Sequence, residues 1–588
     1  MKNVIALFLL GLLTANCYPQ KSNRYPYLDF STFNSCNWSW LDHQDNTELQ
    51  YNVLSNSTDN GFLQIDYKKK TWSAPGMRFL LSEHVVLPSV QYKHLSVSLP
   101  AMNSTNNVLS LKVVGIDKNE RIVFGKEDSI AVSPSWKDLS IFWHGGDVKA
   151  LNIFIEYKGD LDTSQRVNLK KIAIKLDQNN IQNTSENIGK FNRSLKSSKI
   201  VQLNSEDFIH LLDNIDDIEG KKVVGLGESA HGSQSIAEAQ VLFLKNLITQ
   251  HNCKLVLLEF PFDLSMLFDL YAQGIAPDTS KELIKGYFKL VMDGGTLMTF
   301  LEWLRVFNSK LERKVHIAGI DNAAFLSTPR IPLLDYHLLL LGIKKSADYL
   351  EKIYNNQIGE VVQMAKHDSG IQSILGRKGF EYYMNALTDQ FNTSESQRFF
   401  NRDSNMAKRA VKLDTLFTRP EEIIAILGHV SHLQKINSVG MHYNPTCGRL
   451  LTERYGKNYY ALDFTFGAGK FNQDSCSSTV RLIEDTLRFV PLHSFEHAAL
   501  MSKGDFFFYS TKYLAPWMTS SMNILRRSQN RNSFHFANLK LRFDGCIFLR
   551  NSAGFSDIER SPFAYSFTFF KQRAAFFKKL LKKEPFKP

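Results

Sequence analysis

The chain has 588 residues, of which 43% are hydrophobic and 22% charged, and its formal net charge is +12 at pH 7. This composition is typical of a globular protein and excludes a largely disordered chain or one made mostly of membrane spans. The length is too great for one ordinary core, so we expect at least two domains. The positive charge is modest for this length. Because neither zinc-ligand spacing nor a broad basic stripe is present, we expect no nucleic-acid partner.

Residues 1–17 have the pattern of a secretory signal, with a Lys, a short apolar run and then small residues. The run is too short to span a bilayer comfortably. Cys17 follows "LLTAN", which resembles a bacterial lipoprotein cleavage box; the alternative is cleavage near Ala15, which would release a soluble protein. We therefore expect a secreted, periplasmic or outer-membrane lipoprotein of a bacterium, with a membrane contact through the lipid if Cys17 is lipidated.

Residues 20–180 alternate apolar and polar residues in short runs separated by turn residues. This rhythm predicts an all-β sandwich of jelly-roll type. Five tryptophans fall in this segment: Trp38, Trp40, Trp72, Trp136 and Trp143. An exposed Trp could stack on a sugar ring and give the sandwich a glycan contact, but tryptophans of sandwiches are more often buried.

Residues 181–199 are polar and rich in Asn and Ser, which indicates a linker. From residue 200 to 560, apolar strand-like runs alternate with amphipathic helical patterns. Apolar strands joined by helices predict an α/β fold with a mostly parallel sheet flanked by helices on both faces. Within this part, residues 206–215 read as a helix, and 330–420 read as a helical subdomain.

The basic C-terminal tail, residues 561–588, contains a run of Phe and Leu alternating with Lys and Arg at near-helical spacing. Such a helix could lie on an anionic membrane surface. A helix docked on the protein with a solvated basic face is at least as common.

Titratable side chains follow four of the apolar runs of the α/β region. They are Glu228 and His231, then Glu259, then Asp321, then His429 and His432. Because the carboxyl ends of parallel strands lie at one edge, we expect these groups in one cleft with coupled, shifted pKa values. A His beside carboxylates can act as a general base toward water. The sequence has no G-x-S-x-G elbow, P-loop or dinucleotide fingerprint. Taken singly, each of these residues could equally be a capping or packing residue.

The motifs "GLGESAHGS", "LLEFPF", "NRDSNMAKRAVKL", "ILGHVSHLQ" and "GRLLTERYGKNYYALDFTFGAGKF" occur in this order over residues 200–560. Together they resemble the erythromycin esterase family, and the predicted sandwich lies outside the resemblance. The resemblance implies hydrolysis of an ester or lactone by a His-activated water, without a metal or other cofactor. Its substrate would be a small-molecule ester, lactone or glycosylated compound.

The resemblance also assigns roles to residues of this chain. His231 would be the general base, with Glu228 and Glu259 as its carboxylate partners. His429 would orient or stabilise the developing oxyanion, and His432 would line the same rim, where the strand-end pattern also places Asp321. The pair Arg402–Asp403 matches an Arg-Asp helix of the family and is either a site element or a structural ion pair.

Three positions depart from the family's pattern: Ser235 and Gln240 stand where an acid and an Arg are common, and Val430 stands where Asn is usual. The missing cation matters because it would stabilise an oxyanion. Arg305 in "FLEWLRVFN" could replace it, although this segment also reads as a plain amphipathic helix.

Two alternatives remain open from the sequence. A divalent metal could bind at Glu228, His231, Glu259 and His429, although a compact His-x-x-x-His helix is absent. The second alternative is a glycan- or ligand-binding protein of the cell envelope whose esterase-like domain has lost turnover, which the changes at Ser235 and Gln240 motivate.

Overall fold

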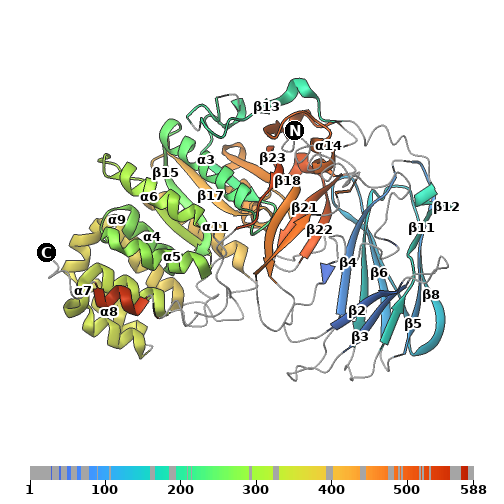
Figure 1. Ribbon diagram of the computed structural model, residues 1–588, viewed down its shortest axis with the longest axis horizontal. Helices are drawn as coiled ribbons and strands as arrows, with labels where there is room; N and C mark the ends of the chain where they lie inside the picture. The colour runs from blue at the N-terminus through green and yellow to red at the C-terminus, as the bar shows by residue number, and fades with distance from the viewer. Residues whose placement is uncertain are drawn as a thin grey trace, which may run out of the picture.

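The computed structural model describes two β-sheet units beside each other, a sandwich and an α/β unit with a helical subdomain (Figure 1). The described residues are 28, 39–40, 49–54, 62–67, 79–88, 90–104, 108–158, 166–183, 194–207, 209–213, 215–290, 295–321, 330–355, 357–391, 401–437, 445–474, 482–487, 490–491, 494–515, 518, 522–528, 531–555, 571 and 573–579. The predicted signal in residues 1–17, with Cys17, lies outside them.

The sandwich consists of two antiparallel sheets that enclose an apolar core. One sheet has the order β1 (Ser39–Trp40), β4 (Phe79–Val86), β9 (Ala150–Lys158), β6 (Val108–Ile116) and β7 (Ile122–Ile130). The other has the order β12 (Asn179–Asn180), β11 (Ala173–Leu176), β5 (His94–Asn103), β10 (Arg166–Leu169), β3 (Phe62–Tyr67) and β2 (Leu49–Leu54), with β8 (Ser133–His144) also on β5. Along β5, Leu95, Val97 and Leu99 are buried and the residues between them are more exposed. This alternation confirms the predicted sandwich.

The described tryptophan side chains of the sandwich have packing partners. Trp143 stacks on Phe124, with ring centroids 4.6 Å apart. The ammonium of Lys170 lies 4.3 Å from the ring centroid of Trp136. Trp38 and Trp72 lie outside the described residues, and only the backbone of Trp40 is described. Glycan contact by the sandwich therefore stays a prediction.

The central sheet of the α/β unit is mostly parallel, as the apolar strands predicted. Its order is β13 (Ile200–Gln202), β20 (Phe506–Ser510), β23 (Gly545–Ser552), β18 (Tyr459–Asp474), β14 (Val223–Glu228), β17 (Ile423–His429), β15 (Cys253–Pro261) and β16 (His316–Asp321). The strands from β23 to β16 run parallel; β20 pairs antiparallel with β23, and β13 pairs antiparallel with β20. A further strand, β19 (Leu482–Leu487), pairs antiparallel with the end of β18. The predicted α/β class is confirmed.

Helices cover this sheet and extend into the helical subdomain (Figure 1). The helices α3 (Gln234–Gln250), α4 (Phe262–Ala272) and α11 (Arg402–Phe417) pack on its strands, whereas α5 (Lys281–Leu290) and α6 (Thr296–Asn308) pack on other helices. The subdomain contains α7 (Arg330–Tyr354), α8 (Ile358–His367) and α9 (Ser369–Phe391). Every element described between residues 330 and 420 is a helix, in agreement with the predicted subdomain.

The helix predicted for residues 206–215 was wrong for the described part of that segment, which forms turns. The side chain of Asn204 accepts a hydrogen bond from the backbone N–H of Glu206, and Asp207 accepts one from that of His210. These local bonds offer the backbone an alternative to the helix.

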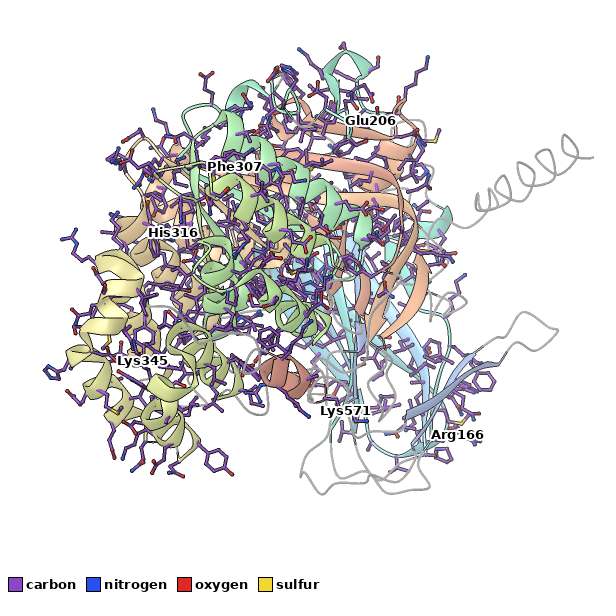
Figure 2. The ribbon with its side chains drawn as sticks, turned by 60° about the vertical axis from the view of Figure 1, so that its left-hand side comes forward. Arg166, Glu206, Phe307, His316, Lys345 and Lys571 are labelled. Atoms are coloured by element: carbon purple, nitrogen blue, oxygen red, sulfur yellow. The ribbon has the colours of Figure 1, made fainter. Side chains whose placement is uncertain are left out.

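The described part of the C-terminal tail docks on the subdomain. Residues 573–579 are helical, and Phe576 and Phe577 are buried. The guanidinium of Arg573 pairs with the buried carboxylate of Asp335 on α7, with Nε 2.7 Å from Oδ1. This helix lies next to the subdomain in Figure 1, and Figure 2 labels Lys571 at its start. Nowhere in the described ranges is a helix both long and apolar enough to cross a membrane.

One buried ion pair joins the sandwich to the α/β unit. Glu120 lies in the turn between β6 and β7, with φ 60°, and its carboxylate is buried. It pairs with Arg542 at the end of α16 (Leu539–Arg542), whose Nε lies 2.8 Å from Oε1. Arg542 Nη1 also donates to Gln434 Oε1 at 2.7 Å. Next to this pair, the hairpin of β21 (Met522–Ser528) and β22 (Arg531–Ala537) packs against β4.

We predict that Glu120→Ala destabilises the protein by about 3–5 kcal/mol, because it leaves the guanidinium of Arg542 buried without its counter-charge. Chemical denaturation would measure this loss. The matched control is Asp138→Asn, an exposed acid of the same sandwich, which should change the unfolding free energy by less than about 0.5 kcal/mol. Equal stability of Glu120→Ala and the control would contradict the proposed importance of this pair.

Candidate active site

The carboxyl ends of four neighbouring strands bring the predicted titratable residues to one rim. Glu228 ends β14 and pairs in register with His429, which ends β17. Glu259 lies near the end of β15, and Asp321 ends β16. These strands are parallel neighbours in the order β14, β17, β15, β16, so their final side chains lie side by side. His231 follows β14 in the turn before α3, and His432 lies on α12 (Val430–Leu433).

His231 and Glu228 form a direct imidazole–carboxylate pair. Nδ1 of His231 lies 2.5 Å from Oε1 of Glu228. Because an ionised carboxylate only accepts, Nδ1 carries the proton and Nε2 is the basic nitrogen of the neutral ring. Nε2 has no hydrogen-bond partner among the described residues, and 28% of the side chain is exposed. The basic nitrogen is therefore available to a water or a substrate.

Arg402, in the first turn of α11, connects two of the carboxylates. Its Nη2 lies 2.6 Å from Oε1 of Glu259 and 2.7 Å from Oδ2 of Asp321, and its Nε lies 2.8 Å from Oδ1 of Asp321. The contact with Asp321 is bidentate, which fixes the plane of the guanidinium. Arg402 Nη1 also lies 3.0 Å from Nε2 of His432. Arg402 therefore binds three members of the cluster at once.

His432 is held between two acids. Its Nδ1 lies 2.7 Å from Oδ1 of Asp403, and its Nε2 lies 3.4 Å from Oε1 of Glu259. Asp403 Oδ2 also accepts a hydrogen bond from the backbone N–H of Cys447, the first residue of α13 (Cys447–Tyr455). Arg402 and Asp403, which are neighbours in sequence, thus bind different partners in the same cluster.

His429 joins the cluster through its backbone as well as its ring. Its N–H donates to Oε2 of Glu259 at 2.5 Å, an approach that needs the glycine before it. A Cβ on Gly428 would lie 2.9 Å from this carboxylate oxygen. The backbone N–H of Ser431 donates to Nδ1 of His429 at 3.3 Å, so the proton of the neutral ring is on Nε2. The rings of His429 and His231 lie 4.7 Å apart.

The electrostatics of the cluster follow from this mixture of acids and bases. Burial acts to lower the pKa of His231, but the carboxylates of Glu228 and Glu259 outweigh it and the pKa is raised. Burial likewise opposes protonation of His432, whose pKa Glu259 and Asp403 raise. Burial acts to raise the pKa of Glu259, yet His432 and Arg402 hold it well below its usual range. These shifts favour the ionised form of Glu259 and the protonated forms of His231 and His432.

Three residues considered in the sequence analysis lie away from the cluster. Arg305 on α6 donates through Nη1 to the carbonyls of Tyr271 and Ala276, at 2.7 and 2.9 Å, so it does not replace the missing cation. Ser235 accepts a hydrogen bond from the backbone N–H of Ala553. Gln240 is buried and donates to the carbonyl of Leu226 on β14. The cation at the rim is Arg402.

The donor set does not form a metal site in the described ranges, where no group of three or more His, Cys, Asp or Glu is arranged to hold an ion. Glu259 instead accepts from Arg402 and from the backbone of His429, and His432 lies between Asp403 and Arg402. These contacts use both oxygens of Glu259 and both ring nitrogens of His432.

One cavity of this unit lies beside α3. It has a volume of about 890 Å³ and is lined by Gln234, Ser235, Glu238 and Arg550 among others. The clustered acids and imidazoles do not line it. Of the residues that line this cavity, Gln234 is the one closest in sequence to the cluster, three positions after His231.

Sequence reasoning missed Ser431 and the separate role of Asp403. Ser431 stands between the two histidines of "GHVSH", and this position next to His429 was its only signal. Asp403 read as the ion-pair partner of Arg402, because adjacent opposite charges suggest a pair. At the start of α11 the two side chains instead point to different partners: Arg402 binds Asp321, and Asp403 binds His432.

We predict that Glu228→Gln lowers the pKa of His231, because the variant removes the nearest carboxylate that stabilises the imidazolium. Titration of the His231 ring by NMR would measure the change. The control is Glu238→Gln, an acid on α3 outside the cluster, which should leave the His231 titration unchanged. An unaltered His231 pKa in Glu228→Gln would refute the coupling of the pair.

Residues 357–552 match the family model described as erythromycin esterase. No curated protein matches the chain. Solved structures with similarity include a succinoglycan biosynthesis protein (17% identity, 63% of this chain and 99% of that chain, TM-score 0.48) and a variant of the erythromycin esterase EreC in its open conformation (18%, 62% and 99%, 0.40).

A carbohydrate-binding module, TmCBM61 in complex with β-1,4-galactotriose, is similar over 27% of this chain and all of its own (15% identity, TM-score 0.20). At these scores the structural likenesses carry no argument about function. The family match covers Arg402, Asp403, His429 and His432, and the central sheet brings Glu228, His231 and Glu259 to the same rim. Over residues 357–552 this match agrees with the resemblance read from the sequence.

Proposed function

We propose that this protein hydrolyses an ester or lactone with a water activated by His231. The family match supports a hydrolase of esterase type. The observation that favours His231 as the base is its paired Nδ1 and its available Nε2, on a side chain that is 28% exposed. A histidine that acts as a general base needs one ring nitrogen held by a partner and the other accessible to water, and His231 meets both conditions.

In the proposed reaction, Nε2 of His231 takes a proton from a water as the water oxygen attacks the ester carbonyl carbon. Glu228 stabilises the imidazolium that forms and keeps its orientation. The carbonyl oxygen becomes an oxyanion in the tetrahedral intermediate. When the intermediate collapses, the bond to the alkoxy oxygen breaks, and the imidazolium returns its proton to the leaving alcohol. The products are a carboxylic acid and an alcohol.

Arg402 and His429 have different proposed roles toward the oxyanion. Arg402 is already bound to Asp321, Glu259 and His432, so it contributes chiefly a fixed positive field. The protonated Nε2 of His429 lies on a ring 4.7 Å from that of His231 and is the proposed hydrogen-bond donor. Preorganised donors and charges of this kind stabilise developing charge without reorganisation.

The departures at Ser235 and Gln240 do not remove a necessary charge in this proposal. Gln240 points to the carbonyl of Leu226 in the interior, and Arg402, whose side chain is 23% exposed, supplies a positive charge at the rim. The competing proposal is a glycan- or ligand-binding protein of the cell envelope without turnover. Secretion, with lipid attachment at Cys17, is part of both proposals and is tested by the mass of the mature N-terminus.

We predict that His231→Asn lowers kcat/KM for ester or lactone substrates by about 10²–10⁴-fold, the usual contribution of a general base. A panel of chromogenic esters and lactones with purified protein would measure the rates. The matched control is His210→Asn, at an exposed position outside the cluster, which should keep the wild-type rate. Equal, negligible rates for all three proteins would favour the binding proposal.

We further predict that kcat/KM rises with pH through a raised His231 pKa, because only the neutral imidazole accepts the proton of water. Below this pKa the ring is protonated and the rate falls. In Glu228→Gln the pKa of His231 is lower, so the acidic limb should move to lower pH, while the maximal rate falls because the ring loses its orienting partner. An acidic limb at the same pH in the wild type and in Glu228→Gln would contradict the assignment of His231 as the base.

A further inference from the structure

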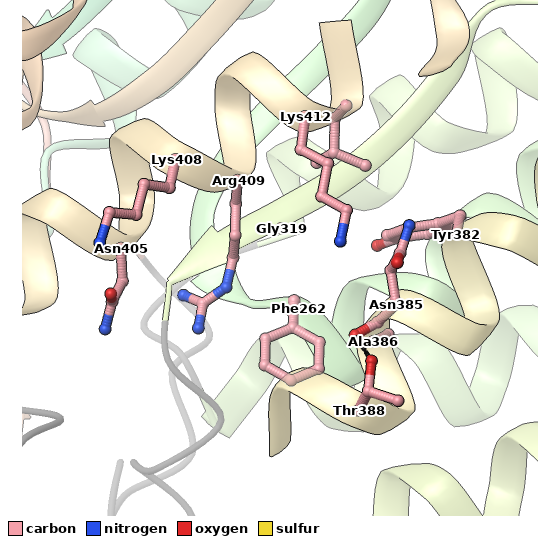
Figure 3. A pocket seen from close by; sticks show the side chains of 11 residues that line it. Phe262, Gly319, Tyr382, Asn385, Ala386, Thr388, Asn405, Lys408, Arg409 and Lys412 are labelled. Atoms are coloured by element: carbon pink, nitrogen blue, oxygen red, sulfur yellow. Dashed lines mark hydrogen bonds between the residues drawn. The ribbon is translucent and has the colours of Figure 1, made fainter. Parts of the chain in front are cut away.

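A second, smaller cavity lies between α11, α9 and the start of α4, beside the edge strand β16. Its volume is about 270 Å³, near the lower end of the range for small-molecule sites, roughly 300–1,000 Å³. The side chains of α11 form one wall and those of α9 the other, with Phe262 between them (Figure 3). The clustered acids and imidazoles of the candidate active site are not part of its lining.

The charged groups of this cavity are all basic. Lys408, Arg409 and Lys412 line it, and none of its described lining residues is acidic. Lys408 and Lys412 are exposed and have no hydrogen-bond or ion-pair partner in the described part of the chain. Unpaired ammonium groups around one concave space favour an anion, because their mutual repulsion falls when an anion binds.

Arg409 is fixed in place before any ligand arrives. Its Nη1 donates to the backbone carbonyl of Ile320 at 2.8 Å, and its guanidinium lies 5.0 Å from the ring centroid of Phe262. These contacts hold the positive charge of Arg409 at one place on the cavity wall. A preorientated guanidinium is well suited to a phosphate group.

The other lining residues could contact a small polar group that carries the anion. Asn385 on α9 has an amide without a partner in the described ranges, and Thr388 adds a hydroxyl oxygen that can accept a hydrogen bond. Lys412 points toward Asn385 across the cavity (Figure 3). Ala386 and Leu413 supply apolar surface.

We propose that this cavity is a binding site for a phosphate-bearing small molecule, separate from the reaction centre. Three cations match a phosphate, which carries up to two negative charges, better than a carboxylate with one. The helix α11 connects the two places: Arg402 lies in the acid–imidazole cluster, and Arg409 is seven residues further on, about 10 Å along the helix axis. The proposal does not depend on ester hydrolysis.

The test is calorimetric titration of the full chain with inorganic phosphate, glycerol 3-phosphate and glycerol at low ionic strength. We expect both phosphates to bind and glycerol not to bind. The double variant Lys408→Gln/Lys412→Gln should raise the dissociation constant by about tenfold or more, since each lost charged hydrogen bond weakens binding strongly. Binding should also weaken as salt is added. Tighter binding of glycerol 3-phosphate than of phosphate would identify a phosphate ester as the ligand class, and equal binding would identify the free ion.

The matched control is Lys345→Gln/Lys366→Gln, which removes the same charge from exposed positions of the helical subdomain that do not line the cavity; Figure 2 labels Lys345. This control should bind phosphate as the wild type does. Three results would overturn the proposal: no binding of either phosphate, equal weakening in the two double variants, or binding of glycerol as strong as that of glycerol 3-phosphate. Thermal unfolding of each variant checks that the fold is retained.

Discussion

The candidate site depends on the charge balance around the partly buried guanidinium of Arg402. The carboxylates of Glu259 and Asp321 are 9% and 2% exposed, and an unpaired carboxylate at such a depth would take up a proton. Arg402 compensates both, and the imidazoles of His231 and His432 add to the compensation at Glu259. Because each charge is stabilised by the others, the rim behaves as one network and not as a set of independent residues.

The sandwich supports this rim from outside the family-matched region. Glu120 enters the α/β unit and pairs with Arg542, and Arg542 donates to the side chain of Gln434. Gln434 is the residue that follows α12, and its backbone N–H donates to Val430 at the start of that short helix. The helix carries His432. A chain of buried polar contacts therefore runs from the sandwich turn to the cluster, which gives the added domain a structural role independent of glycan contact.

Much of the fold could be predicted from the sequence, and the reasons are local. Fully apolar runs such as "CKLVLLEF" can only be satisfied in a sheet covered on both faces, and alternating runs such as "HLSVSLP" only in a half-buried strand. The β21–β22 hairpin, the edge strand β13 and its neighbour β20 were missed, because short strands gain their order from neighbours distant in the chain. The helix prediction for residues 206–215 was wrong because the side chains of Asn204 and Asp207 accept hydrogen bonds from nearby backbone N–H groups, which favours turns over a helix.

The sequence by itself determined which groups reach the rim, because an acid or imidazole at the end of an apolar parallel strand has no other edge to occupy. Only the tertiary structure decided how these groups pair. Arg402 and Asp403 are neighbours in the chain, yet one binds Asp321 and Glu259 and the other binds His432. Arg305 was considered from the sequence as a cation for the cleft, but its guanidinium donates to the carbonyls of Tyr271 and Ala276 near α4. Pairing depends on distances of a few ångströms between segments far apart in sequence, and neither periodicity nor spacing along the chain encodes those distances.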